Sequence, residues 1–247
     1  MSMFKDQINQ ESLPKHVAVI MDGNGRWAKK IGKARIFGHR NGVKAVRETA
    51  EAAAELGIEH LTLYAFSTEN WNRPKLEVSA LMMLLVDTLK KEINTLNKNN
   101  IKLHAIGDLT KLPKKTYKAL VDGIESTKNN TRMTLHLALN YSSRWEIIEA
   151  AKKIAVLAKE GKLDPNSVDE TEFDKHLATA GIPDPELLIR TSGERRLSNY
   201  LLYQLAYTEL YFTDNYWPEF RKVDFYKALI DFQMRERRFG MTSDQIS

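Results

Sequence analysis

Apolar residues along this chain occur in short runs that alternate with longer stretches in which they recur every three or four positions. Short runs rich in β-branched residues predict buried strands, and the longer spacing predicts amphipathic helices. The predicted strands cover residues 17–21, 61–66, 101–106, 133–139, 187–190 and 210–212. The predicted helices cover residues 41–56, 74–96, 113–126, 144–160, a short stretch between 169 and 181, and 225–238.

This alternation of strands and helices predicts the fold class. Repeated β-then-α units favour an α/β fold, a single domain with a mainly parallel sheet of about six strands covered by helices on both faces. The sequence contains no internal repeat, low-complexity segment or linker that would divide it. We expect residues 1–14 to form a loose N-terminal segment, residues 15–240 to form the domain, and residues 241–247 to form a C-terminal tail.

Composition narrows the class of protein. The chain has 247 residues, of which 43% are hydrophobic and 28% charged, as in ordinary globular proteins. No apolar run is long enough to span a bilayer, and the start lacks the apolar region of a signal peptide. The absence of cysteine excludes disulfides, thiol nucleophiles and thiolate metal sites. These features predict a cytoplasmic protein.

The net charge of +5 raises the question of a nucleic-acid or membrane partner. However, no lysine-rich tail or basic stripe with interleaved aromatic residues is present, and acidic residues are interspersed through most predicted helices. We therefore expect a solvated surface and no nucleic-acid partner. The arginines close to the predicted strand ends are an exception to this interpretation, because they are candidates for ligand binding.

Polar residues follow several predicted strands at the point where each strand ends. Asp22 and Asn24 follow the first strand, residues 67–73 follow the second, Asn140 follows the fourth, and Arg190 ends the fifth. The carboxyl ends of parallel strands lie at one edge of a sheet, which is where α/β proteins bind ligands. A plain tight turn is the alternative interpretation of the stretch around Asp22 taken alone.

The cations near these strand ends predict phosphate binding, because guanidinium groups bind phosphate oxygens in bidentate fashion. Taken singly, each arginine is more typical of a surface ion pair. Their number suggests two polyphosphate groups, and Asp22 could hold a divalent metal beside them. The candidate phosphate-binding side chains are Arg26, Arg35, His39, Ser67, Arg73, Arg190, Arg195, Arg196 and Ser198.

Several common motifs are missing. The chain has no Gly-x-x-x-x-Gly-Lys-Ser/Thr loop, no Gly-x-Gly-x-x-Gly at a helix start and no Gly-x-Ser-x-Gly elbow. The missing lysine counts against a nucleotide-binding or phosphoryl-transfer enzyme. The histidines lack His-x-x-x-His zinc spacing, which leaves Mg²⁺ held by carboxylate and phosphate oxygens as the expected metal. His104 and His136 alternate with apolar residues and are interpreted as core or edge histidines.

Taken together, seven stretches in the same order resemble the cis-prenyltransferase family, in particular its bacterial undecaprenyl diphosphate synthases. Members of this family elongate farnesyl diphosphate with isopentenyl diphosphate units and create a cis double bond at each addition. The resemblance implies a polyprenyl (undecaprenyl) diphosphate product, a precursor of the lipid carrier for cell-wall glycans. The matching stretches are residues 16–30, 37–39, 64–74, 77–82, 190–199, 209–214 and 235–240.

The resemblance also implies roles for individual residues. Asp22 becomes the catalytic, metal-linked carboxylate, and Glu209 a further Mg²⁺ ligand. Asn70 is described in the family as the proton acceptor, but a neutral carboxamide is a weak base, so orientation of the substrate, with a diphosphate oxygen taking the proton, is the alternative. The implied substrate-binding residues are Gly23, Asn24, Gly25, Arg26, Arg35 and His39 for the allylic diphosphate, Arg190, Arg196 and Ser198 for isopentenyl diphosphate, and Ser67, Glu69, Asn70, Trp71 and Arg73 between them. Trp27, Thr68 and Leu197 are further expected substrate-binding residues.

The position of Glu209 conflicts with a parallel sheet. It precedes the sixth predicted strand, so a parallel strand would place it at the edge opposite Asp22. Either that strand runs otherwise, a loop folds back, or a second subunit reshapes the region.

The resemblance further implies an apolar tunnel for the growing chain, although such a leucine stripe is by itself typical of ordinary core. It implies a homodimer in which the stretch 238–240 reaches the diphosphates, and peripheral association with the inner face of the membrane for product release. A noncatalytic subunit of the same fold and a synthase of shorter chains remain alternatives. The expected tunnel residues are Ala65, Leu81, Leu84, Leu85, Leu89, Ile101, Leu103, Met133, Leu135 and Leu137.

Overall fold

The computed structural model describes residues 2–245, except for the side chains of residues 2, 3 and 243. Its centre is one six-stranded sheet with the strand order β3-β4-β2-β1-β5-β6, and every pair of neighbours is parallel. This confirms the predicted single-domain α/β fold. The strands are β1 (His16–Ile20), β2 (His60–Ser67), β3 (Ile101–Ile106), β4 (Met133–Tyr141), β5 (Leu187–Arg190) and β6 (Glu209–Phe212).

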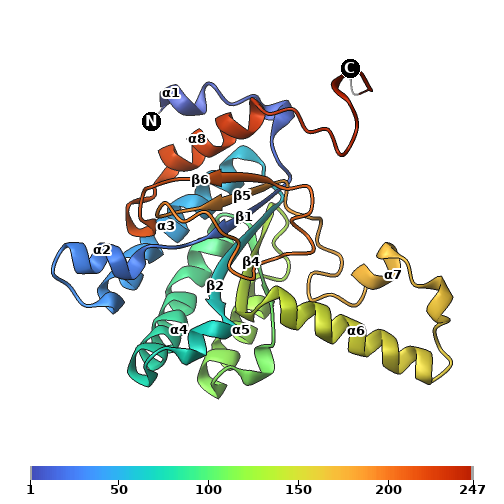
Figure 1. Ribbon diagram of the computed structural model, residues 1–247. Coiled ribbons are helices and arrows are strands. Elements are labelled where there is room, and N and C mark those ends of the chain that lie inside the picture. Colours follow the sequence, from blue (N-terminus) through green and yellow to red (C-terminus); the bar gives the residue numbers. More distant parts are fainter. Residues whose placement is uncertain (1, 246–247) are drawn as a thin grey trace.

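Helices connect the strands, and Figure 1 shows their arrangement around the sheet. The α-helices are α1 (Ser2–Lys5), α2 (Asn24–Lys30), α3 (Arg35–Leu56), α4 (Lys75–Lys98), α5 (Lys114–Thr127), α6 (Ser143–Lys159), α7 (Glu170–Asp174) and α8 (Lys222–Gln233). Short 3₁₀ turns are η1 (Gln10–Ser12), η2 (Thr68–Asn72), η3 (Leu109–Lys111), η4 (Pro165–Ser167), η5 (Trp217–Glu219) and η6 (Ser243–Gln245). None of the described helices combines the length and the apolar composition that a membrane span requires.

The two faces of the sheet are covered differently. On one face, side chains such as Val19 and Leu63 pack in a large apolar core with α3, α4, α5 and α8. On the other face, Tyr200, Leu201 and Leu205 from an irregular segment cover the strands, with Trp145 at the start of α6. The rest of α6 and α7 project to one side of the sheet (Figure 1).

Helix α2 occupies a stretch whose two glycines predicted a turn. Gly23 caps this helix in a left-handed conformation with φ 99°, and glycine has a low helix propensity, so the pattern concealed the helix. The following helix α3 begins at Arg35 rather than at residue 41. It includes Gly38, where a Cβ would lie 1.9 Å from the backbone oxygen of Asn24, so the two helices pack closely only because this residue is glycine.

The predicted ends of the last two helices were wrong. Helix α7 ends at Asp174 and does not continue towards Gly181. Helix α8 ends at Gln233 rather than near residue 238. Beyond it, Arg235 pairs with Asp231 four residues earlier, as in a continuing helix, and also with Glu209 of β6. Only the contact with Glu209 is tertiary, and it has no signature in the helical pattern.

The N-terminal segment contacts the last helix. Ile8 is buried in the main core. The backbone N–H of Asn9 donates to the Gln233 side chain at 3.2 Å, and the Gln233 amide donates back to the Asn9 carbonyl at 2.6 Å. In the tail expected for residues 241–247, residues 246 and 247 lie outside the described part of the chain.

Candidate active site

The candidate site lies where β1 and β5 end side by side. These strands are neighbours in the sheet, with Ile20 in register with Arg190. The chain continues from β1 towards β2 on one side, whereas β5 leads to β6 on the other. This reversal is the position at which open α/β sheets bind ligands. Asp22, two residues beyond β1, accepts a hydrogen bond from the Arg190 guanidinium at 3.0 Å.

Asp22 is held as a carboxylate by several donors. Its Oδ1 accepts the Gly23 N–H at 2.6 Å and forms an ion pair with Arg26 at 3.2 Å. Its backbone is fixed by Thr191, whose hydroxyl lies 2.9 Å from the Asp22 nitrogen and 2.7 Å from its carbonyl oxygen. Burial alone would raise the pKa of Asp22, but these hydrogen bonds and the two arginines lower it below its ordinary value. The side chain is therefore ionised at neutral pH.

Arg190 connects Asp22 to the loop that follows β5. It is buried, with 3% of its surface exposed, and donates to the Ser198 hydroxyl at 2.8 Å and to the carbonyl of Arg196. Ser198 has a φ of 52°, so the loop turns sharply to bring its hydroxyl inward. The Arg190 Nε has no partner among the described residues. A buried guanidinium N–H without a partner is a donor that a bound anion could satisfy.

Two pairs of arginines share a carboxylate. Glu194 accepts from Arg26 at 2.6 Å and also pairs with Arg196. On the other side of the site, Glu77 lies 3.3 Å from Arg35 and 3.2 Å from Arg73.

Asp22, Glu77 and Glu194 are paired with five arginines, Arg26, Arg35, Arg73, Arg190 and Arg196, so these ion pairs retain an excess of positive charge. Such a cluster attracts and binds polyanions. The role predicted for these arginines, phosphate recognition, fits this arrangement.

Glycines at the start of α2 allow close approach at the site. A Cβ at Gly25 would lie 2.8 Å from Cζ of Arg35, so only glycine lets that guanidinium lie against α2. At Gly23, a Cβ would lie 2.6 Å from Tyr216 and 2.8 Å from Ser192, in a left-handed conformation that glycine alone adopts readily. A side chain at Gly25 would push the Arg35 guanidinium aside, and one at Gly23 would displace Tyr216 and Ser192.

His39 and Asn24 line a pocket beside the arginines. His39 Nε2 and Asn24 Oδ1 are both buried and have no hydrogen-bond partner among the described residues. Burial lowers the pKa of His39 to about 4, and the nearby charges of Arg73 and Arg35 lower it too. His39 is therefore neutral at pH 7. Buried polar groups are normally satisfied, so these two atoms mark a place for a ligand.

The segment after β2 forms the turn η2 above the pocket. Asn70, which lines the pocket, accepts the Ser67 N–H with its side-chain oxygen at 3.2 Å. The indole of Trp71 donates to Asn140 at the end of β4 at 2.7 Å. Glu69 accepts from Asn199 at 2.7 Å, which ties this turn to the Arg190 loop. The predicted convergence of strand ends is therefore observed here.

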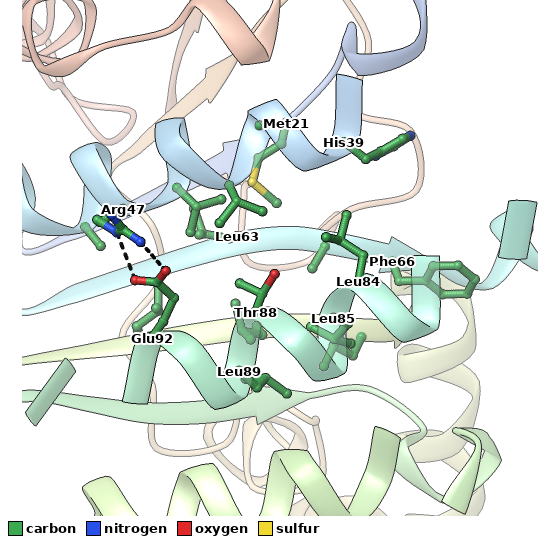
Figure 2. A pocket seen from close by; sticks show the side chains of 18 of the residues that line it. Met21, His39, Arg47, Leu63, Phe66, Leu84, Leu85, Thr88, Leu89 and Glu92 are labelled. Carbon is green, nitrogen blue, oxygen red and sulfur yellow. Dashed lines mark hydrogen bonds and ion pairs between the residues drawn. The ribbon is translucent and has the colours of Figure 1, made fainter. Parts of the chain in front are cut away.

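An apolar pocket extends from this cluster between α3 and α4, over the sheet. Its volume is about 240 Å³. Figure 2 shows Leu84, Leu85 and Leu89 of α4 facing it, with His39 at one end. The lining includes most of the expected tunnel residues: Ala65, Leu81, Leu84, Leu85, Leu89, Ile101, Leu103, Leu135 and Leu137. Met133 is buried in the core but is not part of this lining.

Three candidate substrate-binding residues make other contacts. The Trp27 ring stacks on Phe37, and its indole donates to Glu219 at 3.0 Å. Leu197 packs with the apolar cluster on the opposite face of the sheet. Thr68 donates to the neighbouring carboxylate of Glu69 at 3.3 Å. These residues support neighbouring segments in the structure.

Glu209 lies at the opposite edge of the sheet from Asp22. It is the first residue of β6, in parallel register with Leu187 at the start of β5. Its carboxylate accepts from Arg235 at 2.9 Å. Within one chain the structure therefore does not bring Glu209 to Asp22. Because β6 runs parallel to β5, the first of the three explanations considered from the sequence, a strand of other direction, is wrong.

The described residues contain no group of three or more His, Asp or Glu side chains arranged to hold a metal ion. This arrangement still suits Mg²⁺, because Mg²⁺ commonly takes one or two protein carboxylates and completes its shell with substrate phosphates and water. Asp22 is such a carboxylate, with 30% of its side chain exposed beside the arginine cluster.

Several residues that shape the site had no role in the sequence-based prediction. Glu77 and Glu194 position four arginines, and Thr191 fixes the Asp22 backbone. The available signal was an acidic residue placed between or beside arginines in the stretches that matched the family. The pairing itself depends on tertiary contacts between distant segments.

Comparison with known proteins agrees with this geometry. Residues 20–240 match the family described as "Putative undecaprenyl diphosphate synthase". The chain is 52% identical to an isoprenyl transferase of Chlorobaculum tepidum over 95% of this chain and 88% of that protein. It is 49% identical to a farnesyl-diphosphate-specific ditrans,polycis-undecaprenyl-diphosphate synthase of Haemophilus influenzae, over 96% of this chain and 99% of that protein.

Two solved structures share the fold. Lavandulyl diphosphate synthase from Lavandula x intermedia, in complex with dimethylallyl diphosphate, superposes with a TM-score of 0.91 at 40% identity, over 93% of this chain and 99% of that chain. A probable undecaprenyl diphosphate synthase from Campylobacter jejuni gives a TM-score of 0.77 at 36% identity, over 92% and 98%. The resemblance seen in the sequence is thus confirmed over nearly the whole chain. This protein belongs to the undecaprenyl diphosphate synthase family and is a cis-prenyltransferase.

Proposed function

We propose that this protein condenses farnesyl diphosphate with successive isopentenyl diphosphate units to undecaprenyl diphosphate. The observation that carries the proposal is the junction of an anion-binding cluster with an apolar pocket at the end of β1. An isoprenoid diphosphate has these two parts, a charged head and a long apolar tail. The names of the Haemophilus influenzae relative and its family support this choice of substrate and product.

The allylic diphosphate is assigned to the side of the cluster next to the pocket. Arg35 and Arg73, which share Glu77, supply guanidinium groups there, and His39 and Asn24 line the adjoining pocket. Arg26 pairs with Asp22 and Glu194, between this side and the Arg196 side. When the allylic carbon–oxygen bond breaks, negative charge grows on the departing diphosphate. Fixed guanidinium groups stabilise that charge without reorganising, which lowers the barrier.

Asp22 is the residue that would hold Mg²⁺, which when bound supplies Lewis-acid stabilisation of the leaving diphosphate. Its low pKa keeps it ionised for this role. Isopentenyl diphosphate is assigned to Arg190, Arg196 and Ser198, whose loop lies across from the allylic side. Glu209 could join the metal only from a second copy of the chain, so we also propose that the active unit is a homodimer.

Asn70 orients the substrates in this proposal. Its carboxamide oxygen already accepts the Ser67 N–H, so its amide N–H groups are the side that faces a ligand. The proton lost from isopentenyl diphosphate at each addition then passes to a diphosphate oxygen. Peripheral contact with the inner membrane surface would receive the apolar product.

A diphosphate-release assay tests the proposed reaction. We expect the purified protein with Mg²⁺ to release inorganic diphosphate when farnesyl and isopentenyl diphosphates are both present, and to release none with either one alone. Addition of a chelator should stop the release. Equal release from a single substrate would identify cleavage of a prenyl diphosphate without condensation, and no release under any of these conditions would contradict the proposal in favour of the noncatalytic alternative.

A further inference from the structure

The apolar pocket has a second polar end, far from the diphosphate cluster. There, Arg47 of α3 and Glu92 of α4 line the pocket on the side away from His39 (Figure 2), and Glu51 and Asn99 line it further along the same chain segments. His39 and Arg47 are eight residues apart on one helix, a separation of roughly 12 Å at the α-helical rise. Neither Arg47 nor Glu92 has a role in the condensation as described above.

The two side chains form a bidentate contact that bridges the helices. Arg47 Nε donates to Glu92 Oε2 at 2.9 Å, and Nη2 donates to Oε1. The Glu92 side chain is mostly covered, with 16% of its surface exposed, whereas 49% of Arg47 is exposed. The pair therefore lies where the pocket interior meets solvent. At the near end, the contact of Arg35 with Glu77 joins the same two helices.

The size of the pocket shows why this end matters. A cavity of about 150 Å³ holds a benzene ring, so a volume of 240 Å³ accommodates on the order of ten carbon atoms. An undecaprenyl tail of eleven five-carbon units is several times larger. A growing chain must therefore extend beyond this space, past the side-chain contact that joins α3 and α4 at Arg47 and Glu92.

We infer that the Arg47–Glu92 pair is a gate between α3 and α4 that limits the length of the polyprenyl product. This inference rests on the proposed function and adds a length-determining element to it. An apolar chain that reaches the pair has to displace Arg47 and leave the covered Glu92 carboxylate without its partner. This displacement costs free energy, because it leaves the poorly solvated charge of Glu92 unpaired.

The gate can open during turnover because one of its two partners is in contact with solvent. Arg47 is half exposed and can swing into solvent without disturbing the helix that carries it. Glu92 is mostly covered, and its helix neighbours Leu89, Thr95 and Leu96 also line the pocket, so its side chain has less conformational freedom. Arg47 is therefore the moving part of the gate, and Glu92 the fixed one.

The test compares product lengths for variants of the pair. Arg47→Gln and Glu92→Gln each remove one charge, and the exchanged variant Arg47→Glu/Glu92→Arg restores a pair with reversed polarity. Lys118→Gln/Asp122→Asn removes an exposed ion pair on α5 that does not line the pocket and serves as the matched control. Each protein is incubated with farnesyl diphosphate, labelled isopentenyl diphosphate and Mg²⁺, and the dephosphorylated products are separated by chain length.

We expect the single variants to shift the product distribution upward by about one isoprene unit or more, since a weakened gate lowers the barrier to further extension. The exchanged variant should return the distribution towards that of the unmodified protein, and the control should match it. Arg47→Lys keeps the positive charge but cannot form the bidentate contact with Glu92. Its product lengths should therefore lie between those of the unmodified protein and those of the single charge-removing variants. Rescue by exchange is a result that a purely structural role of either side chain would not produce.

Unchanged product lengths in both single variants would overturn the gate. A shift in product length of equal size in the control variant would also overturn it. So would an exchanged variant whose product lengths are no closer to those of the unmodified protein than the product lengths of the single variants are. An unmodified protein that makes no elongated product contradicts the proposed function itself, and this result differs from elongation with a length that ignores the pair.

Discussion

Asp22 and Arg190 lie 168 residues apart in the sequence, yet a guanidinium nitrogen of Arg190 lies 3.0 Å from the Asp22 carboxylate. The contact exists because β1 and β5 are parallel neighbours that end together. It joins the residue proposed to hold the metal to the residue proposed to bind isopentenyl diphosphate. The two proposed subsites therefore lie in direct contact through this ion pair.

The first prediction concerns the Asp22 carboxylate. In Asp22→Ala, turnover should fall by on the order of a hundredfold to a thousandfold, because stabilisation of the leaving diphosphate is lost. Isopentenyl diphosphate binding, measured by calorimetry, should weaken only slightly, since Arg190 keeps its bond to Ser198. Lys118→Gln is a suitable control on a distant exposed helix. Comparable turnover in Asp22→Ala would contradict the role of this carboxylate.

Much of the fold could be predicted from the sequence because the buried strands have a strong local signature. The apolar runs at residues 101–106 and 187–190 coincide with β3 and β5. Helix α2 was missed because Gly23 and Gly25 are typical of turns. In the structure these glycines are required by contacts with Tyr216 and Arg35, which no local pattern reveals.

Some of the residues that form the site could also be predicted from the sequence. The strand ends predicted where the polar side chains meet, and the arginines predicted an anion site. The carboxylates that hold those arginines, Glu77 and Glu194, could not be assigned because their partners come from other segments. The parallel register of β6 then decided where Glu209 lies within one chain.

A second prediction concerns the apolar pocket. Ala65 lines it, so Ala65→Phe should fill part of the space and shorten the product distribution while early additions continue. Chromatographic sizing of the dephosphorylated products measures the effect. Val121→Phe, at an exposed position on α5 outside the pocket, should leave product length unchanged. Identical product lengths for Ala65→Phe and the unmodified protein would show that Ala65 does not contact the growing chain.

A third prediction concerns stability at acidic pH. Burial lowers the pKa of His16 to about 4, although the hydrogen bond to the Pro183 carbonyl acts in the opposite direction. Burial, together with the neighbouring histidines, also lowers the pKa of His136, to about 2. The folded state thus keeps both rings neutral, whereas the unfolded chain takes up protons below a pH of about 6.5.

Because the unfolded state binds more protons in this window, the free energy of unfolding should fall as the pH decreases from 6.5 towards 4. The expected slope is about 1 kcal/mol per pH unit for each such histidine. Urea unfolding at several pH values measures it. His136→Asn should give a shallower slope, whatever its stability at pH 7.5. A slope unaffected by this substitution would show that His136 titrates normally.

A fourth prediction concerns the C-terminus and the dimer. Phe239 contacts the exposed ring of Tyr207, with ring centroids 5.8 Å apart, so the tail lies beside β6 and Glu209. Deletion of residues 238–247 should lower activity sharply while the circular dichroism spectrum stays folded. Sedimentation should show a dimer for the full chain. A fully active truncated protein, or an active monomer, would be incompatible with a site completed by a second subunit.

The central claim is that the site formed by Asp22 and Arg190 performs successive prenyl additions. Mass spectrometry of the products made from farnesyl diphosphate and isotopically labelled isopentenyl diphosphate tests it most directly. The unmodified protein should give a ladder spaced by single isoprene units and ending at undecaprenyl diphosphate, and Asp22→Ala should give almost none of it. The absence of a ladder from the unmodified protein, or an equal ladder from Asp22→Ala, would contradict the claim.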